Sequence, residues 1–187
     1  ILEQHAESYR KIRNTFRYIL GNLNDSFEKV DFEKLNLKEL PELEQYMLNK
    51  IFNLNLKFEK NFNIYNFHSL YKELLHFCTL DLSAFYFDIR KDTLYCDPIN
   101  SQKRKSTLKF LNIVLEILLK WFAPILSFTT EEIYSLLKIK TNESVHLEKF
   151  PKIPSVWKNE ILENKWHELI KIRDKCNSSI EEKRASK

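Results

Sequence analysis

The sequence predicts an all-α protein made of long helices joined by few connections. Its 187 residues contain one Gly and five Pro, so few positions favour the tight turns that link β-strands. Hydrophobic residues make up 43% of the chain and recur at intervals of three and four, which is the spacing of one buried helix face. With 14 Phe and 8 Tyr, the chain has enough bulk for the core of one domain.

The first expected helix covers about residues 3–22, and its exit is expected at 24–26. At about 100° per residue, its apolar side chains form one face. These side chains are Tyr9, Ile12, Phe16, Ile19, Leu20 and Leu23. Arg10, Arg13 and Arg17 form an adjacent stripe, with Asn14 beside them. Guanidinium groups match phosphate oxygens and also stack on bases, so this stripe is a candidate RNA-binding surface. The alternative is a solvated basic flank that nearby Glu residues balance.

Further helices are expected in the first half of the chain. Pro41 suits the first turn of a second helix, which runs to about Phe62. Residues 63–66 are rich in turn formers and predict a break, after which a third helix begins near Phe67. We interpret residues 81–83 as a bend or an N-cap that leads into another helical stretch rich in aromatic residues.

The second half is expected to hold helices and one short extended segment. Ser101 is expected to cap a helix over residues 102–122, whose apolar end predicts the most buried helix of the domain. Thr129 and Glu132 have the spacing of a capping box before a short helix. Apolar residues that alternate along the chain predict an extended segment near 144–150.

A final helix is expected over about residues 156–183, with one apolar side. That side consists of Ile161, Leu162, Trp166, Leu169, Ile172, Cys176 and Ile180. Pro151 and Pro154 precede this helix. We therefore divide the chain into a helical bundle at 1–150 and a helical extension at 151–187.

Composition excludes several kinds of site. With Gly21 as the single Gly, no glycine-rich phosphate-binding loop can be written. Cys78, Cys96 and Cys176 form no CxxC pair, and the five His residues lack metal-ligand spacing, so we expect no metal and no disulfide framework. No apolar run reaches about 18 residues, so no membrane partner is expected, and the cysteine usage favours a cytoplasmic location. A net charge of +4 is compatible with an RNA partner without requiring one.

A second basic cluster flanks the loop at 97–98. Its members are Arg90, Lys91, Lys103, Arg104 and Lys105. Cations on loops and at helix starts suit phosphate contacts, and the alternative is a solvated charge run. Asp88 and Asp92 superficially resemble a general acid–base pair, but the neighbouring cations favour surface ion pairing. We assign no catalytic residue.

Several strings, taken in order, resemble one family. They are SYRKIRNTFRYILGNLND (8–25), FHSLYKELLHFCTLDLSAFYFDIRKDTLYCD (67–97), LLKWFAPILSFTTEEIYSLL (118–137), SVHLEKFP (144–151) and WHELIKIRDKCNSSIEEKRASK (166–187). These sequences resemble the anticodon-binding region of the isoleucyl-tRNA synthetases, which are class I aminoacyl-tRNA synthetases. The resemblance covers essentially the whole chain. The family often has Trp near Tyr46, and an aromatic residue there fits either a core or a stacking role.

The resemblance implies an antiparallel helical bundle that recognises the anticodon arm of the tRNA for isoleucine. It carries this role to Arg10, Arg13, Asn14 and Arg17, for which buried ion pairing is the competing role. The partners it implies are that tRNA and the other domains of the same synthetase. The class motifs HIGH and KMSKS are absent from the sequence. The resemblance therefore implies that ATP, Mg²⁺ and the ligase activity belong to a catalytic domain of the parent protein, and that this chain needs no cofactor.

Two alternatives remain open at this stage. The chain could be a helical domain that braces neighbouring domains and has little affinity for RNA. It could also be the same domain of a valyl-, leucyl- or methionyl-tRNA synthetase. These share the helical fold, although their sequences resemble the strings quoted above less closely.

Overall fold

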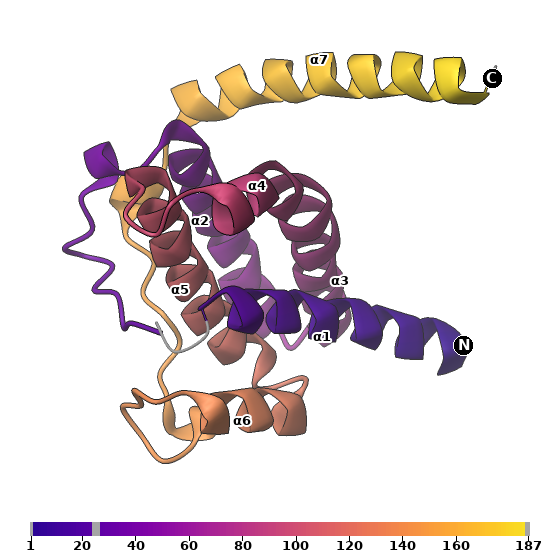
Figure 1. The fold of residues 1–187 in the computed structure, drawn as a ribbon. Helices are drawn as coiled ribbons and strands as arrows, with labels where there is room; N and C mark the ends of the chain where they lie inside the picture. Colours follow the sequence, from indigo (N-terminus) through magenta and orange to yellow (C-terminus); the bar gives the residue numbers. More distant parts are fainter. Residues whose placement is uncertain (1, 24–26, 186–187) are drawn as a thin grey trace.

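The computed structural model describes residues 2–23 and 27–185, and these form helices joined by loops and short turns (Figure 1). No β-strand occurs in these two ranges. The α-helices are α1 (Leu2–Leu23), α2 (Glu42–Asn63), α3 (Phe67–His76), α4 (Asp88–Cys96), α5 (Gln102–Phe122), α6 (Ser127–Leu136) and α7 (Glu160–Ala185). A π-helix, η2 (Phe77–Phe87), joins α3 to α4, and 3₁₀ turns lie at η1 (Leu37–Glu39), η3 (Val145–Leu147) and η4 (Ser155–Trp157). The all-α prediction is confirmed, while the exit from the first helix, expected at 24–26, lies outside the described residues.

Helix α5 forms the centre of the bundle, as its apolar sequence predicts. Most of its side chains are buried, and α1, α2, α4 and α6 all pack against it. Its aromatic contacts reach three other elements: Phe122 meets Phe16 of α1, Trp121 stacks on α2, and Phe110 meets η2. Ser101 accepts a hydrogen bond from the amide of Arg104, so the predicted cap and both predicted ends of this helix are confirmed.

The bend predicted at 81–83 is wrong, because the chain continues as a π-helix from α3 into α4. The Ser83 hydroxyl donates to the carbonyl of Cys78 five residues earlier, at 2.8 Å, which matches the wider turn of a π-helix. The hydroxyl thus serves this turn and does not cap a new helix.

The predicted capping box at Thr129 and Glu132 is also wrong. Helix α6 begins earlier, at Ser127, and no side chain caps its first turn. Thr129 lies inside the helix, where it is buried. The extended segment predicted near 144–150 is interrupted by the 3₁₀ turn η3, although Ser144 and Glu148 on either side of it are extended.

The final helix begins at Glu160, four residues later than expected, because residues 155–157 form a separate turn with Trp157 buried. Of the apolar side predicted for this helix, Leu162 is buried and Trp166 packs on the core, whereas the later members are exposed. Arg173, near the middle of α7, still contacts Asp88 of α4, and Figure 1 shows the C-terminal end of α7 extending beyond the bundle. The division of the chain at residue 150 stays a prediction.

Candidate nucleic-acid interface

Helix α1 has one face in the core and an adjacent face in solvent. Ile12, Phe16, Ile19 and Leu23 are each no more than 1% exposed, which fixes the rotation of the helix. That rotation brings the stripe predicted from the sequence to the surface. All four of its members are exposed: Arg10, Arg13, Asn14 and Arg17.

These four residues line an open groove between α1 and α6. Its opposite wall consists of Thr129, Glu132, Ile133 and Leu136 of α6, and Phe16, Leu20 and Gly21 complete it. Tyr9 of α1 shares a hydrogen bond of 2.9 Å with the Thr129 hydroxyl, which ties the two helices together beside the groove. The groove therefore has one wall rich in guanidinium groups and one wall that mixes apolar and polar side chains.

The basic wall carries charge that is free to meet a ligand. Arg10 forms an exposed ion pair with Glu7 at 2.7 Å, and an exposed pair of this kind contributes little stability. Within the described ranges, neither Arg13 nor Arg17 forms an ion pair with a carboxylate. Buried ion pairing with any carboxylate of the described ranges is therefore excluded for these two residues. Their guanidinium groups lie in solvent beside the groove.

The second basic cluster does not form one surface, and the prediction is wrong for Arg90. This residue is inside the bundle, where its Nε and Nη2 donate to the two carboxylate oxygens of Glu44 at 2.7 and 2.6 Å. The Tyr86 hydroxyl donates to the same carboxylate at 2.8 Å. The side chain of Arg90 is 7% exposed, so it has no free donor face for a phosphate.

The remaining members of the cluster are closer to the surface. Lys91 pairs with Asp88 at 2.9 Å, which fits the surface ion pairing expected for that carboxylate. Arg104 donates to the carbonyl of Asp97 at 2.8 Å and so braces the loop before α5, while Lys103 and Lys105 are exposed. Because α5 rises 1.5 Å per residue over its 21 residues, this cluster lies about 30 Å from the end of α5 that leads into α6. The two basic surfaces are therefore separate.

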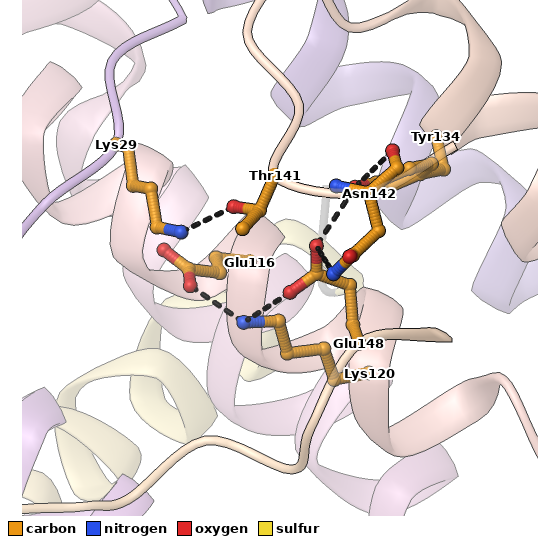
Figure 2. A network of polar contacts seen from close by, with 7 residues as sticks. All are labelled: Lys29, Glu116, Lys120, Tyr134, Thr141, Asn142 and Glu148. Carbon is orange, nitrogen blue, oxygen red and sulfur yellow. Dashed lines mark hydrogen bonds and ion pairs between the residues drawn. The ribbon is translucent and has the colours of Figure 1, made fainter. Parts of the chain in front are cut away.

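A partly buried polar network holds α6 and the loop after it in place (Figure 2). The Tyr134 hydroxyl of α6 donates to Glu148 at 2.9 Å and lies 3.1 Å from the carbonyl oxygen of Asn142. Lys120 of α5 pairs with Glu116 at 2.7 Å and with Glu148 at 3.5 Å. The carboxylate of Glu148 thus links three elements, which keeps the α6 wall of the groove fixed relative to α5.

The pKa of Glu148 follows from this setting. Burial on its own raises the pKa of a carboxyl group, but the hydrogen bonds from Tyr134 and Asn142 and the charge of Lys120 favour the ionised form. Their combined effect is the larger, so the pKa of Glu148 lies below its ordinary value. Glu148 is therefore an ionised structural group of the fold.

Sequence reasoning missed the α6 wall of the groove. The sequence pattern indicates Glu132 only as a capping residue and gives no signal for Phe128. Phe128 is nevertheless 92% exposed, and Glu132 is exposed as well. A helical projection of α6 from Ser127 would have placed both away from its buried side chains, Ile133 and Tyr134.

Other kinds of site find no support in the described part of the chain. No group of three or more His, Cys, Asp or Glu side chains is arranged to hold a metal ion there. None of the helices in that part combines the length and apolar character needed to cross a membrane. Tyr46, which fitted either a core or a stacking role, is buried and stacks on Trp166, so its role is in the core.

Comparison with known proteins agrees with this architecture. Residues 44–187 match the model of the family described as anticodon-binding domain of tRNA ligase, and the chain belongs to this family. Helix α1 precedes the matched range and is covered by the comparison with individual relatives.

Those relatives are isoleucine--tRNA ligases. The chain is 65% identical over 187 residues to the one from Pelagibacter ubique (strain HTCC1062), which covers all of the chain and 21% of that protein. It is 40% identical over 188 residues to the one from Agrobacterium fabrum (strain C58 / ATCC 33970), and 42% identical over 180 residues to the one from Brachyspira hyodysenteriae (strain ATCC 49526 / WA1). These alignments cover 100% and 96% of the chain, and 19% of each relative. The chain thus corresponds to the anticodon-binding domain of isoleucine--tRNA ligase and spans about a fifth of the length of these relatives.

Proposed function

We propose that the groove between α1 and α6 binds the anticodon arm of the tRNA for isoleucine. The observation that carries this proposal is the state of Arg13 and Arg17. Both are exposed on one wall of the groove, and neither forms an ion pair within the described ranges. Arg13 and Arg17 are suited to a polyanion, because their binding releases counterions from the phosphates and breaks no ion pair within the described ranges.

The composition of the groove fits an RNA loop better than a continuous duplex. Phosphate contacts position a nucleic acid, and Arg10, Arg13 and Arg17 provide them along one helix face. Asn14 adds an amide that can donate to and accept from base edges. RNA is read mainly through unpaired bases that hydrogen-bond and stack, and an anticodon loop presents such bases. Lys91, Lys103, Arg104 and Lys105 would form a separate phosphate contact at the other end of α5.

The wider role follows from the position of this domain in its relatives. We infer that the parent protein is an ATP-dependent isoleucine--tRNA ligase, and that this chain orients the tRNA for a catalytic domain elsewhere in it. The absence of HIGH and KMSKS from these 187 residues supports placing amino-acid activation, with ATP and Mg²⁺, outside the chain.

A second candidate function is bracing of neighbouring domains, which the exposed side of α7 favours. Leu169, Ile172 and Ile180 are 42%, 58% and 48% exposed, on the side of α7 that the bundle does not cover. Apolar side chains along one helix are typical of a surface that another protein segment covers. Bracing and RNA binding use different surfaces, so one experiment can separate them.

The test is a titration of the 187-residue chain with the tRNA for isoleucine and with a copy whose anticodon is exchanged, at several salt concentrations. If four to six phosphates are neutralised, the logarithm of the association constant should fall against the logarithm of salt with a slope of about −3 to −5. The exchanged copy should bind more weakly at every salt concentration. Absence of binding, or equal binding of the two RNAs, would contradict anticodon recognition by this chain and favour bracing.

A further inference from the structure

The outer rim of the groove carries an aromatic side chain that the fold does not use. Phe128, in the first turn of α6, is 92% exposed, the highest value among the large hydrophobic side chains of the described residues. Within those residues it makes no ring contact with another aromatic side chain. Exposure of a whole phenyl ring leaves a large apolar face in water, and such a face gains free energy whenever a planar partner covers it.

Helix geometry places this ring next to the groove. At about 100° per residue, Glu132 lies about 40° and Leu136 about 80° around α6 from Phe128. Both Glu132 and Leu136 line the groove, and both are exposed. Phe128 therefore stands on the rim of the α6 wall, across from the wall that bears the arginines.

Glu132 is the second unusual feature of this wall. It is the single carboxylate among the residues that line the groove, and no described cation forms an ion pair with it. A carboxylate repels phosphate, so its position beside three arginines is unfavourable for simple backbone binding. An ionised carboxylate only accepts hydrogen bonds, which makes it complementary to the amino groups of bases.

We propose that Phe128 and Glu132 form a base-reading rim that takes one unpaired base carrying an exocyclic amino group. The phenyl ring stacks on the face of the base, and the carboxylate accepts a hydrogen bond from its amino group. Guanine, adenine and cytosine carry such a group, whereas uracil has only its ring N3–H as a donor, so the rim favours amino-bearing bases over uracil. The inference rests on the proposed function, because the arginine wall holds the phosphates of the same RNA.

The stacking half of the proposal is tested with two hairpin RNAs that carry the isoleucine anticodon arm. One has its normal loop, and the other has abasic sites in the loop, so that every phosphate is kept and the bases are lost. Phe128→Leu keeps an apolar side chain but removes the aromatic face. It should weaken binding of the normal hairpin by about fivefold or more and leave binding of the abasic hairpin unchanged.

Phe128→Trp is the matched variant that restores an aromatic face. It should bind the normal hairpin at least as tightly as the wild-type chain, and its fluorescence should be quenched by that hairpin and not by the abasic one. The three native Trp residues are buried or partly buried, so subtraction of the wild-type signal isolates residue 128. If Phe128→Leu binds the normal hairpin as the wild type does, stacking by residue 128 is excluded and the proposed rim is overturned.

The hydrogen-bonding half is tested with Glu132→Gln, which removes the charge but keeps the size. An amide both donates and accepts, so the preference for loops with amino-bearing bases over uracil-substituted loops should shrink by about fivefold. Binding of the abasic hairpin should become tighter, because a charge that repels phosphate is lost. An unchanged preference would overturn the role of Glu132.

Arg13→Ala separates failure of the rim from failure of the proposed function. If Arg13→Ala weakens binding of both hairpins while the Phe128 and Glu132 variants behave as the wild type, only the rim is wrong. If the wild-type chain binds neither hairpin, the groove is not an RNA site and both proposals are wrong.

Discussion

Arg90 and Glu44 form a bidentate ion pair inside the bundle, with donor–acceptor distances of 2.7 and 2.6 Å. The Glu44 side chain is fully buried and the Arg90 side chain is 7% exposed. The pair joins α2 to α4, which are 46 residues apart in the sequence at this contact. Its charges can persist in the core only because each satisfies the other, and the Tyr86 hydroxyl adds a third hydrogen bond.

Removal of one member should therefore destabilise the bundle strongly. Arg90→Met leaves the Glu44 carboxylate buried without its counterion, and we expect a loss of about 3–5 kcal/mol in the free energy of unfolding. Urea unfolding followed by far-UV circular dichroism measures this change. Adding Glu44→Gln, which still accepts from the Tyr86 hydroxyl, should restore at least about 1 kcal/mol. The RNA affinity of the folded variant should equal that of the wild type. A selective loss of affinity would show that Arg90 contributes to RNA binding.

In contrast to Arg90→Met, Arg13→Ala should keep the stability of the bundle and weaken RNA binding. Its guanidinium group is exposed and has no carboxylate partner in the described ranges, so the free energy of unfolding should change by less than about 0.5 kcal/mol. If it contacts a phosphate, the slope of the logarithm of affinity against the logarithm of salt should become about one unit shallower. Arg184→Ala, in the exposed end of α7, is the matched control and should leave the slope unchanged. A less stable Arg13→Ala variant with unaltered affinity would make Arg13 a structural residue.

Glu148 should make the fold sensitive to acid. Its pKa is lowered in the folded chain, so its contribution to stability is complete above the ordinary Glu pKa of 4.5 and is lost as the pH falls through its folded value. The free energy of unfolding of the wild type should decline from about pH 5 downwards more steeply than that of Glu148→Gln. Thermal unfolding at a series of pH values checks this difference.

Tyr134→Phe is the companion variant, because it removes the largest of the contacts that favour ionised Glu148. It should move the acid-sensitive range of the chain upwards in pH and cost about 1–2 kcal/mol at neutral pH. Equal pH profiles for Tyr134→Phe and the wild type would show that the network in Figure 2 does not determine the acid sensitivity.

The three cysteines should differ sharply in reactivity. Cys96 and Cys176 are exposed, whereas Cys78 is buried and burial raises the pKa of its thiol. A buried thiol in its protonated form does not react with alkylating reagents. Mass spectrometry after treatment of the native chain with iodoacetamide should therefore find two modified thiols, and the third only in denaturant. Modification of Cys78 at the rate of the other two would indicate that η2 opens readily.

The helices that could be predicted were those whose signals are local. Helix α5 was predicted at both ends because Ser101 caps it and Pro124 follows it closely. The arginine stripe of α1 could be predicted because helical periodicity alone separates it from the apolar face. The burial of Arg90 could not be predicted, because its ion-pair partner, Glu44, lies on another helix. Periodicity reports that a face is apolar and carries no information on distant partners.

Helix α7 also shows that periodicity alone does not say which apolar residues the bundle covers. Its apolar residues continue to Ile180, as the pattern predicts, but those beyond Ile170 are exposed. Likewise, the pattern indicates Glu132 as a capping residue and gives no sign that it lines a groove. That groove exists only once α6 is packed beside α1. Sequence reasoning gave the elements and one wall of the candidate site, while the second wall required the tertiary structure.

Trp166 should be the residue that attaches α7 to the bundle. Its ring stacks on Tyr46 at a centroid distance of 5.2 Å and meets the edge of Phe85 at 6.0 Å. Trp166→Ala removes both contacts, and because the ring is only partly buried we expect a loss of about 2 kcal/mol, less than for a central core residue. Hydrogen exchange should then show faster exchange in α7 while α5 keeps its protection, since α7 can detach without opening the bundle. Ile180→Ala, a change on the exposed part of the same helix, should alter stability by less than about 0.5 kcal/mol. Equal acceleration of exchange in α5 and α7 would mean that α7 unfolds only together with the core.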